Sequence, residues 1–398
     1  MGNSDLPHFR IKNRFQKKKE LYSDILTKDI LSDVCLKITG SRDFTCEFDD
    51  IGYNVGRMAV LEYEGVIAYI SFSETSAKGR NSSFQSVPSA LSRYILEENE
   101  SKRICFYFLP STGNIQTSYF IFMYRLMATV GIEFLNDVEF LSQRIQPFST
   151  ITDIINSRDM NRGRNPSNNS TYLTQGSGGE VQIFGKTYGA SKYETTLLSV
   201  AAWHLTSVQI ELYQIIEHGL TVLPKSSKQA IESLGRIKLI ASDLRLERSE
   251  FIHKDSLRSP LFTYNLLAKL GAKKCSLCEC EIPELIQGAH IWPVAEIKKK
   301  RGVNIEEKIR WATDGDNGIW MCENHHKMLD ANLIVIDEEG HVSYKKDLEE
   351  ANRRYLKGIT PRMKLASSIL NTTFIDYLQK RNASIDFQIY DRISVIIL

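Results

Sequence analysis

The sequence lacks an excess of charge of either sign. It holds 50 lysines and arginines against 48 aspartates and glutamates in 398 residues, a net charge of +2. A chain so close to neutral gives no overall electrostatic sign of nucleic-acid binding, so basic clusters have to be assessed one by one. No internal repeat is visible either. The hydrophobic share of 42% is ordinary for a globular protein, and the length allows two or three domains.

Long hydrophobic runs are also scarce. Residues 1–20 lack the apolar core of a secretory signal. The segment Tyr119–Leu135 is apolar, but it is shorter than the roughly 20 residues of a membrane-spanning helix, and Arg125 and Glu133 interrupt it. We therefore expect a buried helix or helix–strand unit there, and no membrane partner.

Cysteines are too few for a disulfide framework. There are seven, an odd number, and Cys35, Cys46 and Cys105 are scattered. This favours reduced thiols in a cytoplasmic protein.

Strand-like and helical segments alternate over residues 1–156, which predicts a mixed α/β domain in a chain of the α+β class. Ser86–Asn99, with Pro88 in its first turn, predicts a helix, and residues 117–143 are expected to be mostly helical. Runs rich in β-branched and aromatic residues predict strands. These runs are VCLKITG (34–40), FTCEF (44–48), AVLEY (59–63), VIAYISF (66–72) and RICFYFL (103–109).

The middle of the chain combines a polar segment with helical patterns. Residues 157–180 are rich in Asn, Ser and Gly and predict a flexible linker or a contact loop. Residues 181–262 are expected to be mainly helical after an initial strand. Within them Lys192–His218 predicts one long helix or two, and Ser226–Phe251 predicts another. A short helix from Pro260 then leads to the cysteine-rich segment.

Four good zinc ligands occur in two short motifs. Cys275 and Cys278 form C-x-x-C, and Cys322 and His325 form C-x-x-H, 44 residues after Cys278. Three thiolates and an imidazole suit tetrahedral Zn²⁺, and this spacing lets one turn present both sulfurs to one ion. We predict a structural zinc site, with Cys280 as the alternative to Cys278. Reduced cysteines in a core are the competing interpretation, which the charged neighbouring residues weaken.

Other candidate ligands remain in the same segment. His326 and Asp330 are four residues apart, so on a helix over Glu323–Ala331 they share one face and can share a metal. His325 points elsewhere on such a helix. The two adjacent histidines can therefore serve two different ions.

With His290 and Asn317 upstream, the segment from Cys275 to about Tyr344 resembles the HNH nuclease family, whose fold is the ββα-metal finger. His290, Asn317 and His326 match the family's three motif positions in order and at similar spacing. The sequence AHIWPV…DGDNGIWMCENHHKMLD is similar to that of HNH domains at the C-terminal end of some bacterial restriction endonucleases. The resemblance implies an HNH domain over residues 263–350, followed by a helical and strand extension over 351–398.

The resemblance also implies roles. His290 would be the general base that takes a proton from the attacking water, and Asn317 would orient the strand and the imidazole. His326, with Asp330, would hold a catalytic Mg²⁺, and the products would carry 5′-phosphate and 3′-hydroxyl ends. Many family members have a ligand immediately before the base, where this chain has Ala289. This departure increases the importance of Asp330.

Two basic stretches are candidates for DNA contact. Lys298, Lys299, Lys300 and Arg301 lie between the two halves of the motif, and Lys78 and Arg80 lie in a small-residue loop after a predicted strand. The competing interpretation of both is a solvated loop.

These features favour a DNA endonuclease of the restriction kind. The N-terminal region would recognise double-stranded DNA, and a homodimer would cut both strands, because one HNH centre cuts one strand. An alternative in the same class is a modification-dependent nuclease or a ligand-gated defence nuclease. A zinc-stabilised DNA-binding protein without catalysis is the alternative from another class.

Overall fold

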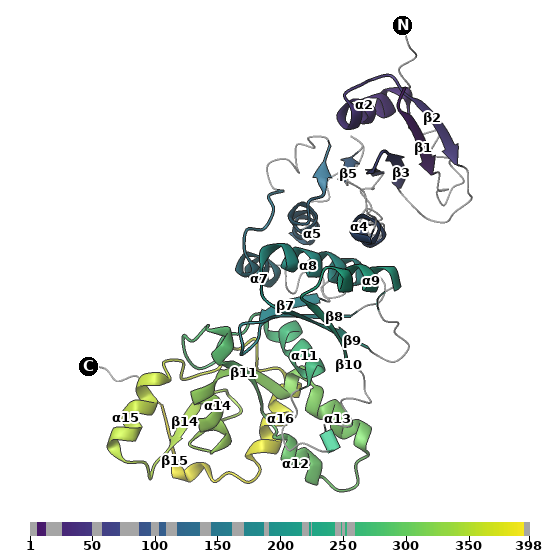
Figure 1. The fold of residues 1–398 in the computed structure, drawn as a ribbon. Coiled ribbons are helices and arrows are strands. Elements are labelled where there is room, and N and C mark those ends of the chain that lie inside the picture. The colour runs from purple at the N-terminus through teal and green to yellow at the C-terminus, as the bar shows by residue number, and fades with distance from the viewer. Residues whose placement is uncertain are drawn as a thin grey trace. The chain divides into compact units, whose positions relative to one another are not determined.

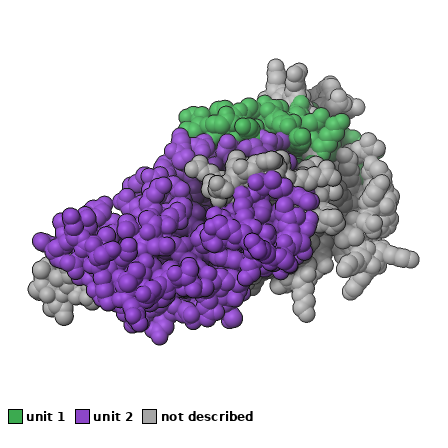
Figure 2. Space-filling view, turned by 90° about the horizontal axis from the view of Figure 1, so that it is seen from below, with its two compact units in different colours: residues 1–161, 187–210, 221–238 green, residues 162–186, 211–220, 239–398 purple. Residues whose placement is uncertain are grey.

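The computed structural model describes most of the chain, whose ribbon is drawn in Figure 1. The described residues are 6–12, 26–49, 58–71, 87–96, 103–108, 118–135, 145–160, 171–186, 191–216, 223, 225–242, 248, 251–252 and 259–393. Together they divide into two compact units with interleaved sequence (Figure 2). Unit 1 comprises residues 1–161, 187–210 and 221–238, and unit 2 comprises residues 162–186, 211–220 and 239–398.

The described strands of unit 1 form a six-stranded mixed sheet in the order β2-β1-β3-β4-β5-β6. The β1–β2, β4–β5 and β5–β6 pairs are parallel, whereas β3 is antiparallel to both its neighbours. The strands are β1 (His8–Lys12), β2 (Thr45–Asp49), β3 (Met58–Tyr63), β4 (Val66–Ser71), β5 (Arg103–Phe108) and β6 (Glu133–Phe134). Four of the five predicted strands are thereby confirmed.

Side chains along each strand of the unit 1 sheet point alternately to its two faces. Both faces carry buried side chains. Ala68 and Ile70 join a core cluster with helix α2 (Lys28–Thr39). On the other face Tyr69 stacks on Phe106, with ring centroids 5.1 Å apart.

Helices α4 (Val87–Leu96) and α5 (Ser118–Thr129) confirm the helices predicted in this part of the chain. In Figure 1 both lie on the side of the sheet away from α2. With β6, α5 forms the helix–strand unit predicted over Tyr119–Leu135, in which the helix is largely buried and Glu133 of the strand is exposed. None of the described helices is both long enough and apolar enough to cross a membrane.

The strand predicted at residues 34–40 was wrong, because this segment is the second half of α2. Thr27 caps the helix, its Oγ1 accepting a hydrogen bond from the amide of Ile30 at 3.4 Å. Gly40 ends the helix at φ 81°, a conformation that glycine adopts without strain. The β-branched residues are tolerated because Leu31, Val34 and Cys35 recur at helical spacing and are buried.

The prediction of a mainly helical middle was wrong in part. Helices α8 (Ser191–Leu205) and α9 (Lys225–Ser233) are present, but residues 210–218 and 237–242 were expected to extend them. They contain instead β9 (Ile210–Ile215) and β10 (Ile237–Ser242). The turn at Gly235 and Arg236, at φ 65° and 55°, separates helix from strand. Ile210 and Leu212 alternate with less buried residues, as in a half-covered strand.

The described ends of the segment predicted as a linker also have regular structure. Residues 157–160 complete α7 (Ile151–Met160), and β7 (Thr171–Gln175) begins after residue 170. Residues 161–170 lie outside the described residues. Strand β7 pairs antiparallel with β8 (Val181–Lys186) in a sheet with described order β10-β9-β8-β7.

Unit 2 is organised around α11 (Pro260–Leu270), the helix predicted before the cysteines. Ser259 Oγ accepts a hydrogen bond from the amide of Phe262 at 3.1 Å, Pro260 opens the first turn, and Gly271 follows the last. The helix contacts β7 and β8 through Tyr264, whose ring meets that of Tyr172 at 5.5 Å. It also contacts the motif strands that follow it.

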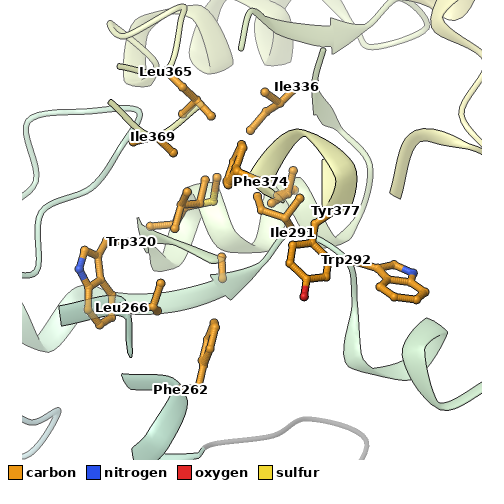
Figure 3. Close-up of a cluster of buried hydrophobic side chains, with 14 of the residues drawn as sticks. Phe262, Leu266, Ile291, Trp292, Trp320, Ile336, Leu365, Ile369, Phe374 and Tyr377 are labelled. Carbon is orange, nitrogen blue, oxygen red and sulfur yellow. The ribbon is translucent and has the colours of Figure 1, made fainter. Parts of the chain in front are cut away.

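The rest of unit 2 is one continuous core. Its elements are β11 (Ile286–His290), α12 (Val294–Lys299), α13 (Ile305–Thr313), β12 (Gly318–Cys322), α14 (Glu323–Asp330), β13 (Ile334–Ile336), β14 (Val342–Lys345), α15 (Glu350–Ile359), α16 (Thr372–Asn382) and β15 (Tyr390–Arg392). Phe374 of α16 is fully buried in the same cluster as Ile291 and Trp320 (Figure 3), and Leu378 of the same helix also belongs to this cluster. The extension after residue 350 therefore completes the core of the HNH-like segment.

Candidate functional site

The motif residues lie on two antiparallel strands and the helix that follows them. Strand β11 pairs with β12 so that Ile286 faces Cys322 and His290 faces Gly318. Helix α14 then begins directly after Cys322 and contacts both strands. This ββα arrangement is the one that the sequence resemblance implied.

The predicted zinc ligands converge. The ligand atoms of Cys275, Cys278, Cys322 and His325 all lie within 4.8 Å of one another. Nδ1 of His325 is 3.0 Å from the Sγ of Cys322 and 3.5 Å from that of Cys275. Cys280 is not part of this group, although its carbonyl accepts a hydrogen bond from the amide of Cys275 at 2.9 Å. Three thiols and one imidazole at this separation can hold a tetrahedral Zn²⁺.

The electrostatics of the cysteines also suit a cation. Burial raises the pKa of Cys275, but hydrogen bonds with His325 and with the backbone at Cys322 and Leu277 lower it to about 6. In contrast, burial and the two neighbouring thiols raise the pKa of Cys278 to about 12. Several thiolates are compatible in so small a volume when a dication neutralises them, because a coordinating thiol is deprotonated by the metal.

Two residues beyond the motif hold the zinc ligands in place, and neither was foreseen. The Nε2 of buried His325 is 3.0 Å from the Oγ1 of buried Thr360, which leaves Nδ1 toward the sulfurs. Arg362 donates to the carbonyl of Cys275 at 2.7 Å and to Glu279 at 2.8 Å. Both residues follow α15, so only the folded chain brings them to the cysteines.

His290 is held as a neutral imidazole. Its Nε2 lies 2.8 Å from the carbonyl oxygen of Ala312, which only accepts, so Nε2 carries the proton and Nδ1 has the free lone pair. Burial lowers the pKa of His290 to about 4, although the hydrogen bond to Ala312 acts in the opposite direction. The imidazole is therefore unprotonated at neutral pH and can accept a proton.

Phe262 of α11 is a further site residue that the sequence did not indicate. Its ring stacks on His290, with centroids 4.0 Å apart and planes inclined by 10°. Two glycines leave the space that the Phe262 and Leu266 side chains occupy. A Cβ atom on Gly318 would lie 2.5 Å from Phe262 Cζ, and a Cβ atom on Gly288 would lie 2.6 Å from Leu266 Cδ1. The two strands approach α11 closely enough to fix the imidazole from one face.

Asn317 is fully buried, and all its polar atoms bind backbone. Its Oδ1 accepts from the amide of Trp292 at 2.7 Å, and its Nδ2 donates to the carbonyls of Trp292 and Trp311 at 3.1 and 3.0 Å. These partners flank His290 and Ala312. Asn317 thus joins the segment after the strand that carries His290 to the end of α13, which carries Ala312.

His325 and His326 face different surroundings on α14. Successive helical residues point about 100° apart, so adjacent histidines diverge. His325 is fully buried at the cysteines, whereas the side chain of His326 is 25% exposed. Its Nε2 lies 3.4 Å from the Oδ2 of Asp330, one turn further on. Ala289 is buried and offers no ligand atom, so His326 and Asp330 are the pair of this motif that can bind a divalent cation.

His290, His326 and Asp330 line one groove of about 910 Å³ in unit 2. Exposed Lys327 and, from α16, Lys380 and Arg381 are also in its wall. A groove with a neutral histidine, a carboxylate and basic side chains provides the groups that phosphodiester hydrolysis needs.

The predicted DNA contacts lie apart from this groove or outside the described residues. The groove wall includes Val294–Glu296 of α12, but not the basic tract Lys298–Arg301 that follows on the same helix and its end. Lys299 pairs with Glu296 at 2.8 Å, and Lys300 and Arg301 are exposed. Lys78 and Arg80 fall in the range 72–86, which the structure does not describe.

Residues 275–337 match the family model described as HNH endonuclease. The match starts at the first cysteine and spans β11, β12 and α14, which carry the site. The chain therefore carries an HNH endonuclease domain, which supports a metal-dependent nuclease with DNA as its substrate. A comparison with curated proteins found no match.

Proposed function

We propose that this protein is a metal-dependent DNA endonuclease of the restriction kind, acting in the cytoplasm and leaving 5′-phosphate and 3′-hydroxyl ends. The observation that carries the proposal is the groove that His290 lines together with His326 and Asp330, with the Nε2 of His290 bonded to the Ala312 carbonyl. The presence of the sizeable unit 1 in addition to the HNH domain favours sequence recognition over simple nicking.

In the proposed reaction, His290 takes the proton of a water that attacks the scissile phosphorus. Phe262 and the Ala312 carbonyl keep its ring from rotating, which limits the loss of orientation at the moment of transfer. His326 and Asp330 would hold Mg²⁺, which supplies charge neutralisation at the phosphate and at the leaving 3′ oxygen. Lys327, exposed at the groove, contributes positive charge for an adjacent phosphate.

One such centre cuts one strand. A double-strand break at a symmetric site therefore needs two copies, and we propose a homodimer in which each HNH domain attacks one strand. The basic tract Lys298–Arg301 at the end of α12, in which Lys299, Lys300 and Arg301 are exposed, would contact phosphates outside the groove, as would Lys78 and Arg80.

Incubation of the chain with plasmid DNA in Mg²⁺ tests this function. Unmodified and cytosine-modified plasmids are compared, each with and without EDTA. Discrete fragments from unmodified DNA support the restriction reading. Cutting of modified DNA alone would replace it with a modification-dependent nuclease, and absence of cutting from both would favour a non-catalytic DNA-binding protein.

The lowered pKa of His290 predicts an unusual pH profile. The base works when neutral, so with a pKa of about 4 the single-turnover rate at saturating Mg²⁺ should stay level from pH 8 to pH 6 and fall only as the pH approaches 4. A histidine with the ordinary pKa of about 6.5 would lose half its active form near that pH. A half-maximal rate near pH 6.5 would contradict the burial-driven shift.

A further inference from the structure

We propose that Arg381 is a positioning residue of the nuclease site, and that α16, outside the matched segment, belongs to the catalytic machinery. This inference deepens the proposed function and rests on it. Arg381 is 8% exposed and lines the groove that holds His290 and His326. A cationic side chain is rarely buried so completely unless its partners need it there.

The hydrogen bonds of Arg381 connect the two halves of the site. Its Nη1 donates to the carbonyl of Ile291 at 3.2 Å, and Ile291 directly follows His290. Its Nη2 donates to the carbonyl of Leu329, directly before Asp330, and to Oδ1 of Asn332 at 3.1 Å. One rigid guanidinium thus joins the end of the base-carrying strand to the end of the metal-binding helix.

The rest of α16 holds Arg381 in this position. The Tyr377 ring lies 6.3 Å from that of Trp292, and its hydroxyl donates to Asp314 at 3.0 Å (Figure 3). At the start of the helix, Asn371 donates to Asp316 at 2.8 Å. Asp314 caps the short turn Gly315–Asn317 and Asp316 lies within it, so α16 and its cap are joined to the turn that presents Asn317 as well as to Ile291 and Leu329.

The planar fork of arginine explains why this residue type is required. Three acceptors on two segments are reached by two nitrogens at fixed separation, whereas a lysine ammonium is a single point. If Arg381 sets the distance between strand and helix, its loss weakens the cation site at His326 and Asp330 and misplaces His290. Groups that orient metal ligands from outside typically change metal affinity or activity by about 10–100-fold.

The test compares Arg381→Met and Arg381→Lys with Arg392→Met in the full chain. Arg392 is the matched control, because it is an arginine of the same unit that pairs with Asp337 at 3.0 Å and does not line this groove. Mn²⁺ binding is measured by electron paramagnetic resonance, together with zinc content, kcat and KM for plasmid cleavage. Zinc content and circular dichroism restrict the comparison to folded protein.

We expect both Arg381 variants to raise the Mn²⁺ dissociation constant about 10–100-fold and to lower kcat, with KM for DNA within about twofold. Arg392→Met should match the wild type. Unchanged Mn²⁺ affinity in folded Arg381→Lys, full rescue by lysine, or a change in KM alone would overturn the positioning role. Because Mn²⁺ binding needs no cleavage, a wild-type chain that binds Mn²⁺ but leaves DNA intact would refute the nuclease proposal alone.

Discussion

Replacing His290 by glutamine is expected to reduce DNA cleavage by about 10²–10⁴-fold, the usual contribution of a general base. The amide nitrogen of glutamine can still donate to the carbonyl of Ala312, the acceptor of the imidazole at 2.8 Å. It cannot take a proton from water. The variant therefore separates the loss of the base from the loss of its hydrogen bond, and single-turnover rates on plasmid DNA measure the difference.

A matched histidine provides the control. His341 lies in the same unit, with a side chain 27% exposed beside Asp337 and Glu339, and it does not line the groove. His341→Gln should retain cleavage within about twofold. Cleavage by His290→Gln within tenfold of the wild type, with DNA binding unchanged, would remove His290 from the mechanism.

Loss of the zinc is expected to destabilise unit 2. An ion bound in thousand-fold excess over its dissociation constant stabilises the folded state by about 4 kcal/mol. At about 2–4 °C per kcal/mol for a unit of this size, Cys275→Ser should lower the melting temperature by about 8–16 °C. The ligands join the loop before β11 to α14, so their loss separates elements that carry His290 and His326.

Cys280→Ser is the control for this effect, because Cys280 is close in sequence to the ligands and outside their cluster. It should retain one zinc per chain, measured by atomic absorption, and the wild-type melting temperature. Loss of zinc in Cys280→Ser with retention in Cys278→Ser would exchange these two cysteines in the ligand set. Zinc-free wild-type protein with an unchanged melting temperature would refute the structural role.

The cluster of candidate zinc ligands was predictable because its spacing signature is local. Cys275 and Cys278 lie on one turn, as do Cys322 and His325, and spacing alone made each pair a candidate. That His325 and His326 face different surroundings followed from helical geometry in the same way. Strands β2 to β5 were predictable because their β-branched and aromatic runs are bounded by polar residues.

The secondary-structure predictions that were wrong concern segments in which tertiary packing overrides the local propensity for helix or strand. The segment 210–215 has apolar residues that fit a helix or a strand, and pairing in the four-stranded sheet decides for the strand. The segment 34–40 has strand-forming residues, but the cap at Thr27 and the core under the sheet make it a helix. Propensity is a weak prior in both cases, because burial of the apolar face contributes more.

The sequence by itself determined which atoms are available for chemistry: three thiols, two adjacent histidines, a carboxylate one helical turn later, and His290. The tertiary structure decided the orientation of the side chains that carry those atoms and the tautomer of His290. The Ala312 carbonyl selects the tautomer of His290, the Phe262 ring fixes its plane, and Thr360 turns His325 toward the sulfurs. These partners lie 22 to 35 residues from the groups they orient. Contacts of that kind have no spacing signature, since packing of α11, α13 and the segment after α15 creates them.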